Sequence, residues 1–153
     1  MHGMMCHMAN AARAIIIEGN NMLLMHRNKN GKMYFTLVGG KMQEGEAPEQ
    51  ALVREVQEET GLTVTDCRLV YLEEHIEPYN HQYIFVCQVA PHGAVAIQDT
   101  SEEGFMNRVS TNTHQPLWVE ASSFGGLPFL TAKLQGAIVT ALKKGFPDEP
   151  VKL

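Results

Sequence analysis

Hydrophobic residues in the first part of the chain fall into short runs that are separated by turn-forming residues. Ala11–Glu18 and Asn21–Arg27 flank the dipeptide Gly19-Asn20, which predicts two strands joined by a tight turn. A second turn at residues 28–32 leads to a short strand around Tyr34–Val38. Three further strands are predicted later in the chain, at Asp66–Glu74, Gln82–Val89 and Leu117–Val119.

Two other segments have the features of helices. Pro48 suits the first turn of a helix, and the predicted helix continues through Ala51–Thr60 to Gly61, which suits the left-handed position past its end. Leu134–Lys144 has helical spacing and two basic residues in its last turn. Asp99–Pro116 has weak periodicity and is predicted to be a long loop. This combination of elements predicts an α/β or α+β fold.

The length and charge are those of a single globular domain. Within the 153 residues we expect a leader at residues 1–10, one domain at residues 11–147 and a short tail at residues 148–153. A net charge of -5 argues against duplex nucleic acid as a partner, but not against a small anionic ligand that meets a local cation. No apolar run approaches the ~18 residues of a membrane span, and the leader lacks the features of a secretory signal.

The cysteines predict a reducing compartment. Cys6, Cys67 and Cys87 are widely spaced and form no CxxC pair, so we expect free thiols and a cytoplasmic protein. In the leader, His2, Cys6 and His7 are suitable ligands for a soft metal, but a frayed terminus is the simpler interpretation.

The segment REVQEETGL places three carboxylates within five positions, near the predicted end of the first helix. Because an α-helix turns about 100° per residue, Glu55, Glu58 and Glu59 fall within an arc of roughly 100°. Two carboxylates about 6 Å apart repel each other by roughly 3 kcal/mol at an effective dielectric constant near 20. Leu52, Val53 and Val56 lie on a different side of the helix, which we expect to face the core. The acidic stripe should therefore point away from the core.

The helix alone leaves two interpretations of the acidic stripe open. It is either a solvated face, where water screens the charges, or a site where carboxylate oxygens bind Mg²⁺ or Mn²⁺. Only Arg54 offers a compensating charge nearby, four residues before Glu58.

The residues upstream of the stripe favour the cation site. The segment GKMQEGEAPEQALVREVQEETGL, residues 40–62, resembles the signature of the Nudix hydrolases at every defined position. This resemblance implies an α/β/α sandwich around a mixed central sheet, in which the signature forms a loop–helix–loop. It also implies a hydrolase that cleaves the pyrophosphate bond of a nucleoside diphosphate linked to another moiety, with Mg²⁺ as cofactor and Mn²⁺ as its substitute. The one departure is Val38, where many members carry proline, and it removes no ligand.

The resemblance also implies a role for individual residues. Arg54 would orient the glutamates, and Glu46 would hold the loop to the helix. The metal ligands would be the carbonyl of Gly39 and the carboxylates of Glu55, Glu58 and Glu59. Substrate contacts are expected from Arg27, Tyr34, Phe35, Gly40 and Lys41. The alternative for Arg27 is a surface salt bridge. For at least one of Tyr34 and Phe35, the alternative is packing in the core.

The general base that activates the attacking water has two candidate positions. In some members it is the residue that matches Glu55. In others it is a glutamate of a downstream loop, for which Glu102 and Glu103 are the candidates here, with a solvated loop as the alternative. We expect His75, His81 and His114 to lie on the surface. Trp118 is expected in the core or in a cavity wall.

The substrate is less well defined than the reaction. Pro78 lies 78 − 62 = 16 positions beyond Leu62, where some ADP-ribose-cleaving members carry proline. Tyr79 follows it, where some dinucleoside-polyphosphate members carry tyrosine, so neither residue discriminates. We favour an ADP-ribose-like or nucleotide-sugar substrate over a nucleoside triphosphate or dinucleoside polyphosphate. The rival is a nucleotide-sensing module without catalysis, which the intact signature glutamates argue against; a homodimer is left open.

Overall fold

The computed structural model describes residues 9–74, 79–98, 101–109 and 111–153. Its centre is a mixed sheet in which β1 (Ala11–Glu18) runs parallel to β6 (His81–Val89) and antiparallel to β4 (Val38–Lys41). The remaining strands are β2 (Asn21–Lys29), β3 (Lys32–Thr36), β5 (Val64–Glu74), β7 (Asn112–Glu120) and β8 (Val151–Lys152). The strand order is β3-β2-β1-β6-β5-β8, with β4 added to β1 and β7 added to β2.

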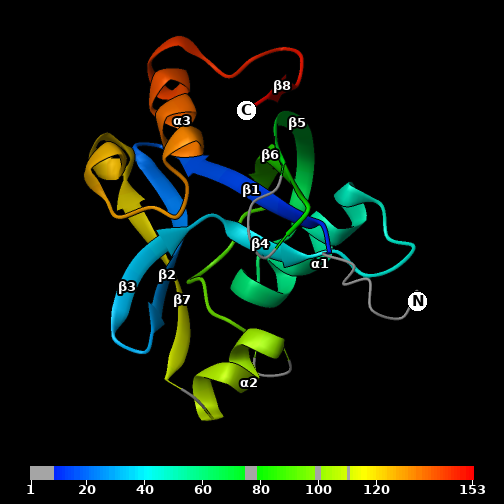
Figure 1. The fold of residues 1–153 in the computed structure, drawn as a ribbon, viewed down its shortest axis with the longest axis vertical. Helices are drawn as coiled ribbons and strands as arrows, with labels where there is room; N and C mark the ends of the chain where they lie inside the picture. Colours follow the sequence, from blue (N-terminus) through cyan, green and yellow to red (C-terminus); the bar gives the residue numbers. More distant parts are fainter. Residues whose placement is uncertain (1–8, 75–78, 99–100, 110) are drawn as a thin grey trace, which may run out of the picture.

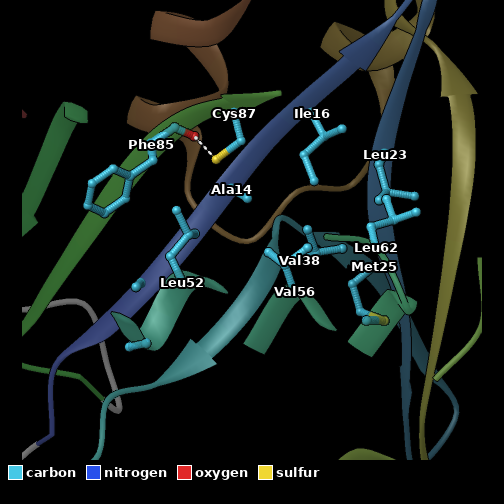
Figure 2. Close-up of a cluster of buried hydrophobic side chains, with 12 residues drawn as sticks. Ala14, Ile16, Leu23, Met25, Val38, Leu52, Val56, Leu62, Phe85 and Cys87 are labelled. Atoms are coloured by element: carbon cyan, nitrogen blue, oxygen red, sulfur yellow. Dashed lines mark hydrogen bonds between the residues drawn. The ribbon is translucent and has the colours of Figure 1, made fainter. Parts of the chain in front are cut away.

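Helices cover both faces of this sheet (Figure 1). On one face α1 (Pro48–Thr60) packs against Ala14 and Ile16 of β1, together with Phe85 and Cys87 of β6 (Figure 2). On the other face lie α3 (Ala132–Lys144) and the 3-10 helix η1 (Ala121–Gly126), in a second core with Ile15. The alternation of buried side chains along β1 therefore builds both cores, and the architecture is the predicted α/β/α sandwich with a mixed sheet.

The first helix has the predicted ends but not the predicted orientation. Pro48 opens it and Gly61 ends it in the left-handed conformation, with φ 78°. Leu52 and Val56 are fully buried, as expected, but Val53 is 42% exposed. Glu55 and Glu59 are only 6% and 3% exposed, so the outward-facing acidic stripe was wrong for two of its three members. The reason is that these two side chains face β4, where Gly40 leaves room for Glu55 and the Gly39 N–H donates to Glu59.

The predicted long loop at Asp99–Pro116 was also wrong. Its described residues form α2 (Glu102–Val109) and the beginning of β7, which starts at Asn112 instead of Leu117. Side chains hold both ends of this short helix. The Ser101 hydroxyl accepts a hydrogen bond from the Gly104 N–H at 3.0 Å. The Asn107 amide brackets the backbone of His114, donating to its carbonyl at 2.8 Å and accepting from its N–H at 2.6 Å.

Other differences are smaller. The strand predicted around Tyr34–Val38 is divided, because β3 pairs with β2 while β4 pairs with β1. Cys67 and Cys87 are free thiols, as predicted, and face each other across β5 and β6. Among the described residues, no helix has the length and apolar character needed to cross a membrane. The residues of the leader that could bind a soft metal (His2, Cys6 and His7) lie outside the described residues, as do His75 and Pro78.

The close pairing of β4 and β1 makes Gly39 sensitive to substitution. A Cβ atom at Gly39 would lie 2.1 Å from the carbonyl oxygen of Ala12, whereas a Cβ at Gly31 would meet nothing within 4 Å. Both glycines have positive φ, 129° and 90°. We therefore expect Gly39→Ala to lower the free energy of unfolding by about 1–3 kcal/mol more than Gly31→Ala, as measured by urea unfolding. Equal losses in the two variants would show that backbone strain alone decides the effect.

Candidate active site

A glycine pair in β4 allows α1 to approach the sheet closely. A Cβ atom at Gly40 would lie 2.7 Å from Oε2 of Glu55, so any side chain at this position would displace this carboxylate. One turn further along the helix, Oε1 of Glu59 accepts a hydrogen bond from the Gly39 N–H at 2.6 Å. The two carboxylates are therefore buried between the helix and β4.

Arg54 fastens the loop to the helix. Its guanidinium makes two hydrogen bonds with Glu46, at 2.8 and 2.9 Å, and a third with the carbonyl of Lys41 at 3.0 Å. Its Nη1 also donates to Glu55 Oε1 at 3.0 Å and to Glu58 Oε2 at 3.2 Å. The hydrogen bond from Arg54 lowers the pKa of Glu46 to about 2, so this pair stays charged at neutral pH. Arg54 and Glu46 therefore hold the loop and the helix in position relative to each other.

Three carboxylates converge beside this fastening. Oxygen atoms of Glu55, Glu58 and Glu103 lie within 4.8 Å of one another. Within the described part of the chain, Glu55 Oε2 and Glu103 Oε1 are buried and have no hydrogen-bond partner. Burial, and then the charge of Glu103, raises the pKa of Glu55 to about 7. Burial likewise raises the pKa of Glu103, and that of Glu59 well above its ordinary value.

Such a cluster fits a divalent cation. Hard cations prefer carboxylate oxygens, and buried anions without partners are unstable unless a positive charge joins them. Glu59, in contrast, is engaged with the backbone of Gly39, and α2 supplies Glu103 in its place at the cluster. Glu55, Glu58 and Glu103 are therefore the residues of this structure that fit Mg²⁺ or Mn²⁺ best.

A cavity of about 410 Å³ opens next to the acidic cluster. Its floor is one face of the part of the sheet formed by β2, β3 and β7, seen beside β1 in Figure 1. Tyr34, Arg27 and His114 stand opposite one another across these three strands and form one row of that floor. The Arg27 guanidinium lies 5.6 Å from the centre of the Tyr34 ring and donates to Asn112 Oδ1 at 2.6 Å. Burial, and then Arg27, lowers the pKa of His114 to about 4, so its ring is neutral at pH 7.

Most of the predicted site residues reach the cavity. Glu58, Arg54 and Glu46 line the adjoining groove, which continues past the acidic cluster. Phe35 does not reach the site, because it faces the other side of β3 and packs in the second core. The structure separates Glu102, which is exposed, from Glu103, which belongs to the cluster. Those lining the cavity are Arg27, Tyr34, Gly39, Gly40, Lys41, Glu55, Glu59, Glu102 and Glu103.

Sequence reasoning missed several residues of the cavity wall. Arg13 carries a signal that was available, because it is a charge inside the apolar run AARAIIIE. His114 was assigned to the surface, but it lies in the cavity. Asn112 and Met106 had no local signal, since both come from the segment predicted to be a loop. Trp118 packs against the first core, as predicted.

The comparisons with known proteins agree with this architecture. A family model described as NUDIX domain matches residues 8–128, which is more than half of the chain. The chain therefore belongs to the Nudix family. An ADP-ribose pyrophosphatase of Streptococcus suis has the same fold, with a TM-score of 0.64 at 20% identity, covering 95% of this chain and 98% of that one.

Two curated relatives differ in their named substrates. An 8-oxo-dGTP diphosphatase of Proteus vulgaris is 40% identical over 73 residues, which cover 46% of this chain and 65% of the relative. An ADP-ribose pyrophosphatase of Methanocaldococcus jannaschii is 36% identical over 106 residues, which cover 66% of this chain and 63% of the relative. The chain thus spans less than two thirds of the length of either relative.

The raised pKa of Glu55 makes the metal-free protein sensitive to pH. The folded state holds the Glu55 proton up to about pH 7, while the unfolded state releases it near 4.5. Between these values the folded state binds more protons, so the free energy of unfolding should fall as the pH rises. In EDTA, we expect Glu55→Gln to reduce this fall by on the order of 1–3 kcal/mol between pH 4.5 and 7.5. Urea unfolding at several pH values measures it, and parallel curves for the two proteins would contradict the assignment.

Proposed function

We propose that this protein is a divalent-metal-dependent hydrolase that cleaves the pyrophosphate bond of a nucleoside diphosphate linked to another moiety. The observation that carries the proposal is the convergence of Glu55, Glu58 and Glu103 beside the cavity, with two buried carboxylate oxygens that have no partner among the residues described. Buried carboxylates without partners are destabilising, and a bound divalent cation would relieve this because its preferred ligands are carboxylate oxygens. The membership of the Nudix family supports the same reaction.

Glu55, Glu58 and Glu103 would hold the metal, for which Mg²⁺ is the natural candidate and Mn²⁺ the substitute. When bound, the ion supplies positive charge that polarises phosphoryl oxygens and lowers the pKa of water. Arg54 keeps Glu55 and Glu58 in position through its hydrogen bonds to both. The hydrogen bond between Glu59 and Gly39 links the helix to β4, which is a supporting role.

Glu103 is the better candidate for the general base. Glu103 offers one oxygen to the metal cluster, which leaves its other carboxylate oxygen to accept a proton; its Oε1 is buried and has no partner among the described residues. Burial raises its pKa, which makes it a stronger base than an exposed carboxylate. Glu55 Oε1 is already bonded to Arg54, and the exposed Glu102 lies outside the cluster.

The remaining cavity wall supports a nucleotide-like substrate. Arg27 and Lys29 face the cavity, and the ion pairs of the described residues include neither of them, so their charges are available to an anion. The rings of Tyr34 and Tyr79 line the same cavity and can stack on a planar base. We propose an ADP-ribose-like or nucleotide-sugar substrate, in line with the names of the Methanocaldococcus and Streptococcus proteins.

A nucleoside triphosphate is the second candidate. Arg27 and Lys29, which pair with no carboxylate in the described part of the chain, would suit the additional charge of a third phosphate. The Proteus relative, named as an 8-oxo-dGTP diphosphatase, favours the same class.

The activity is tested by chromatographic separation of the nucleotide products across a panel of ADP-ribose, nucleotide sugars, nucleoside triphosphates and dinucleoside polyphosphates with Mg²⁺. We expect turnover with at least one of these classes, highest for ADP-ribose or a nucleotide sugar. Glu58→Gln is the matched control, because this side chain is partly exposed and its loss leaves both cores intact. Its kcat should fall at least about a hundredfold. Nucleotide binding without turnover in the unsubstituted protein would instead indicate a sensing module.

The two neighbouring glutamates of α2 provide an internal comparison. Glu103→Gln should lower kcat by about 10²–10⁴-fold, the range typical of a positioned carboxylate base, when measured at saturating metal. Glu102→Gln removes the same charge from the adjacent exposed position and should lose far less. Near-normal turnover in both variants would remove α2 from the proton transfer and leave Glu55 as the base.

A further inference from the structure

The carbonyl of Gly39, which the family signature suggests as a metal ligand, already has a partner in this chain. Arg13 Nη1 donates to it at 3.1 Å and also to the carbonyl of Leu37 at 3.3 Å. A guanidinium thus lies at the position from which a metal ion would approach this oxygen. Arg13 stands directly opposite Gly39 in the pairing of β1 with β4, so the backbone itself sets this contact.

A buried chain of polar groups holds Arg13 in place. Its Nε donates to Gln82 Oε1 at 3.0 Å, and Gln82 Nε2 donates to Glu73 Oε1 at 3.2 Å. Gln82 and Glu73 are only 4% and 2% exposed, so these partners cannot be replaced readily by water. The guanidinium is therefore a preorganised group of the cavity wall.

Within the described part of the chain, no carboxylate lies in ion-pair contact with Arg13. The ion pairs of the described residues do not include Arg13, although it lines the cavity. Its guanidinium carbon lies 5.4 Å from the centre of the Tyr79 ring, and its hydrogen bonds on the protein side go to neutral acceptors. Arg54 differs in this respect, because it contacts three carboxylates.

We propose that Arg13 is a built-in cation that takes the place of one divalent metal ion at the Gly39 carbonyl. This inference rests on the proposed function, because it concerns the same site. The metal bound by this protein is then confined to the cluster of Glu55, Glu58 and Glu103. The positive charge on the Gly39 side of the cavity comes from the protein and needs no metal. Removal of the guanidinium frees the Gly39 carbonyl and leaves Glu59 nearby, which together offer oxygen ligands to an additional ion.

The number of Mn²⁺ ions bound per chain, measured by titration with electron paramagnetic resonance in the absence of nucleotide, tests this proposal. Arg13→Met keeps the length and apolar stem of the side chain but removes its charge and its donors. We expect Arg13→Met to bind one more Mn²⁺ per chain than the unsubstituted protein. Arg13→Lys, which restores a cation, should return the number to that of the unsubstituted protein.

Arg27→Met is the matched control, because it removes the same charge from the same cavity. The guanidinium of Arg27 bonds to Asn112 and not to Gly39. It should leave the number of bound ions unchanged. Gln82→Met is a second route, since it removes the anchor of Nε and keeps the charge, and it should bind an additional, weaker ion. Circular dichroism checks that each variant is folded.

An equal, non-zero number of ions in the unsubstituted protein, Arg13→Met and Gln82→Met would overturn the proposal while the metal site stands. The same gain in Arg27→Met and Arg13→Met would also overturn it, because the effect would then reflect general charge. No bound ion in any of the proteins would overturn both this proposal and the proposed function.

Discussion

The absence of side chains at Gly39 and Gly40 is the constraint on which the candidate site depends. These two positions let α1 lie against β4 with carboxylates between them, where any larger residue would collide with Glu55 or with the backbone of β1. The fastening by Arg54 and Glu46 then fixes the loop over the helix. The acidic cluster and the cavity both lie at this contact, so the backbone of the glycine pair sets the position of the chemistry.

Close packing of acids makes the site electrostatically incomplete. Arg54 already shares its charge among three carboxylates, and Arg13 is bound to carbonyl and amide oxygens. The cluster around Glu55 and Glu103 therefore stores repulsion that only a proton or a cation can relieve. At the other side of the cavity, Arg27 and Lys29 carry positive charge. This opposition of charge gives an asymmetric ligand a single favourable direction in the cavity.

The sequence was sufficient wherever local chemistry decides the structure. Pro48 and Gly61 set the ends of α1, and the signature glutamates pointed to the cluster. It was insufficient where tertiary contacts decide. Buried Glu59 accepts a hydrogen bond from the Gly39 N–H of β4, a tertiary contact that periodicity cannot reveal. The sequence of helix α2 resembles a loop because it is short and weakly periodic. The helix is stabilised instead by the hydrogen bonds of Ser101 and Asn107.

The contact between Asn107 and His114 has a consequence for how this protein can diversify. Asn107 bonds to the backbone N–H and carbonyl at position 114, so this hold on α2 does not depend on which side chain that position carries. The imidazole itself faces the cavity. Evolution can therefore exchange the residue at position 114, and with it the shape of the ligand wall, without displacing the helix that carries Glu103. Ligand preference and catalytic geometry are separable traits at this point of the fold.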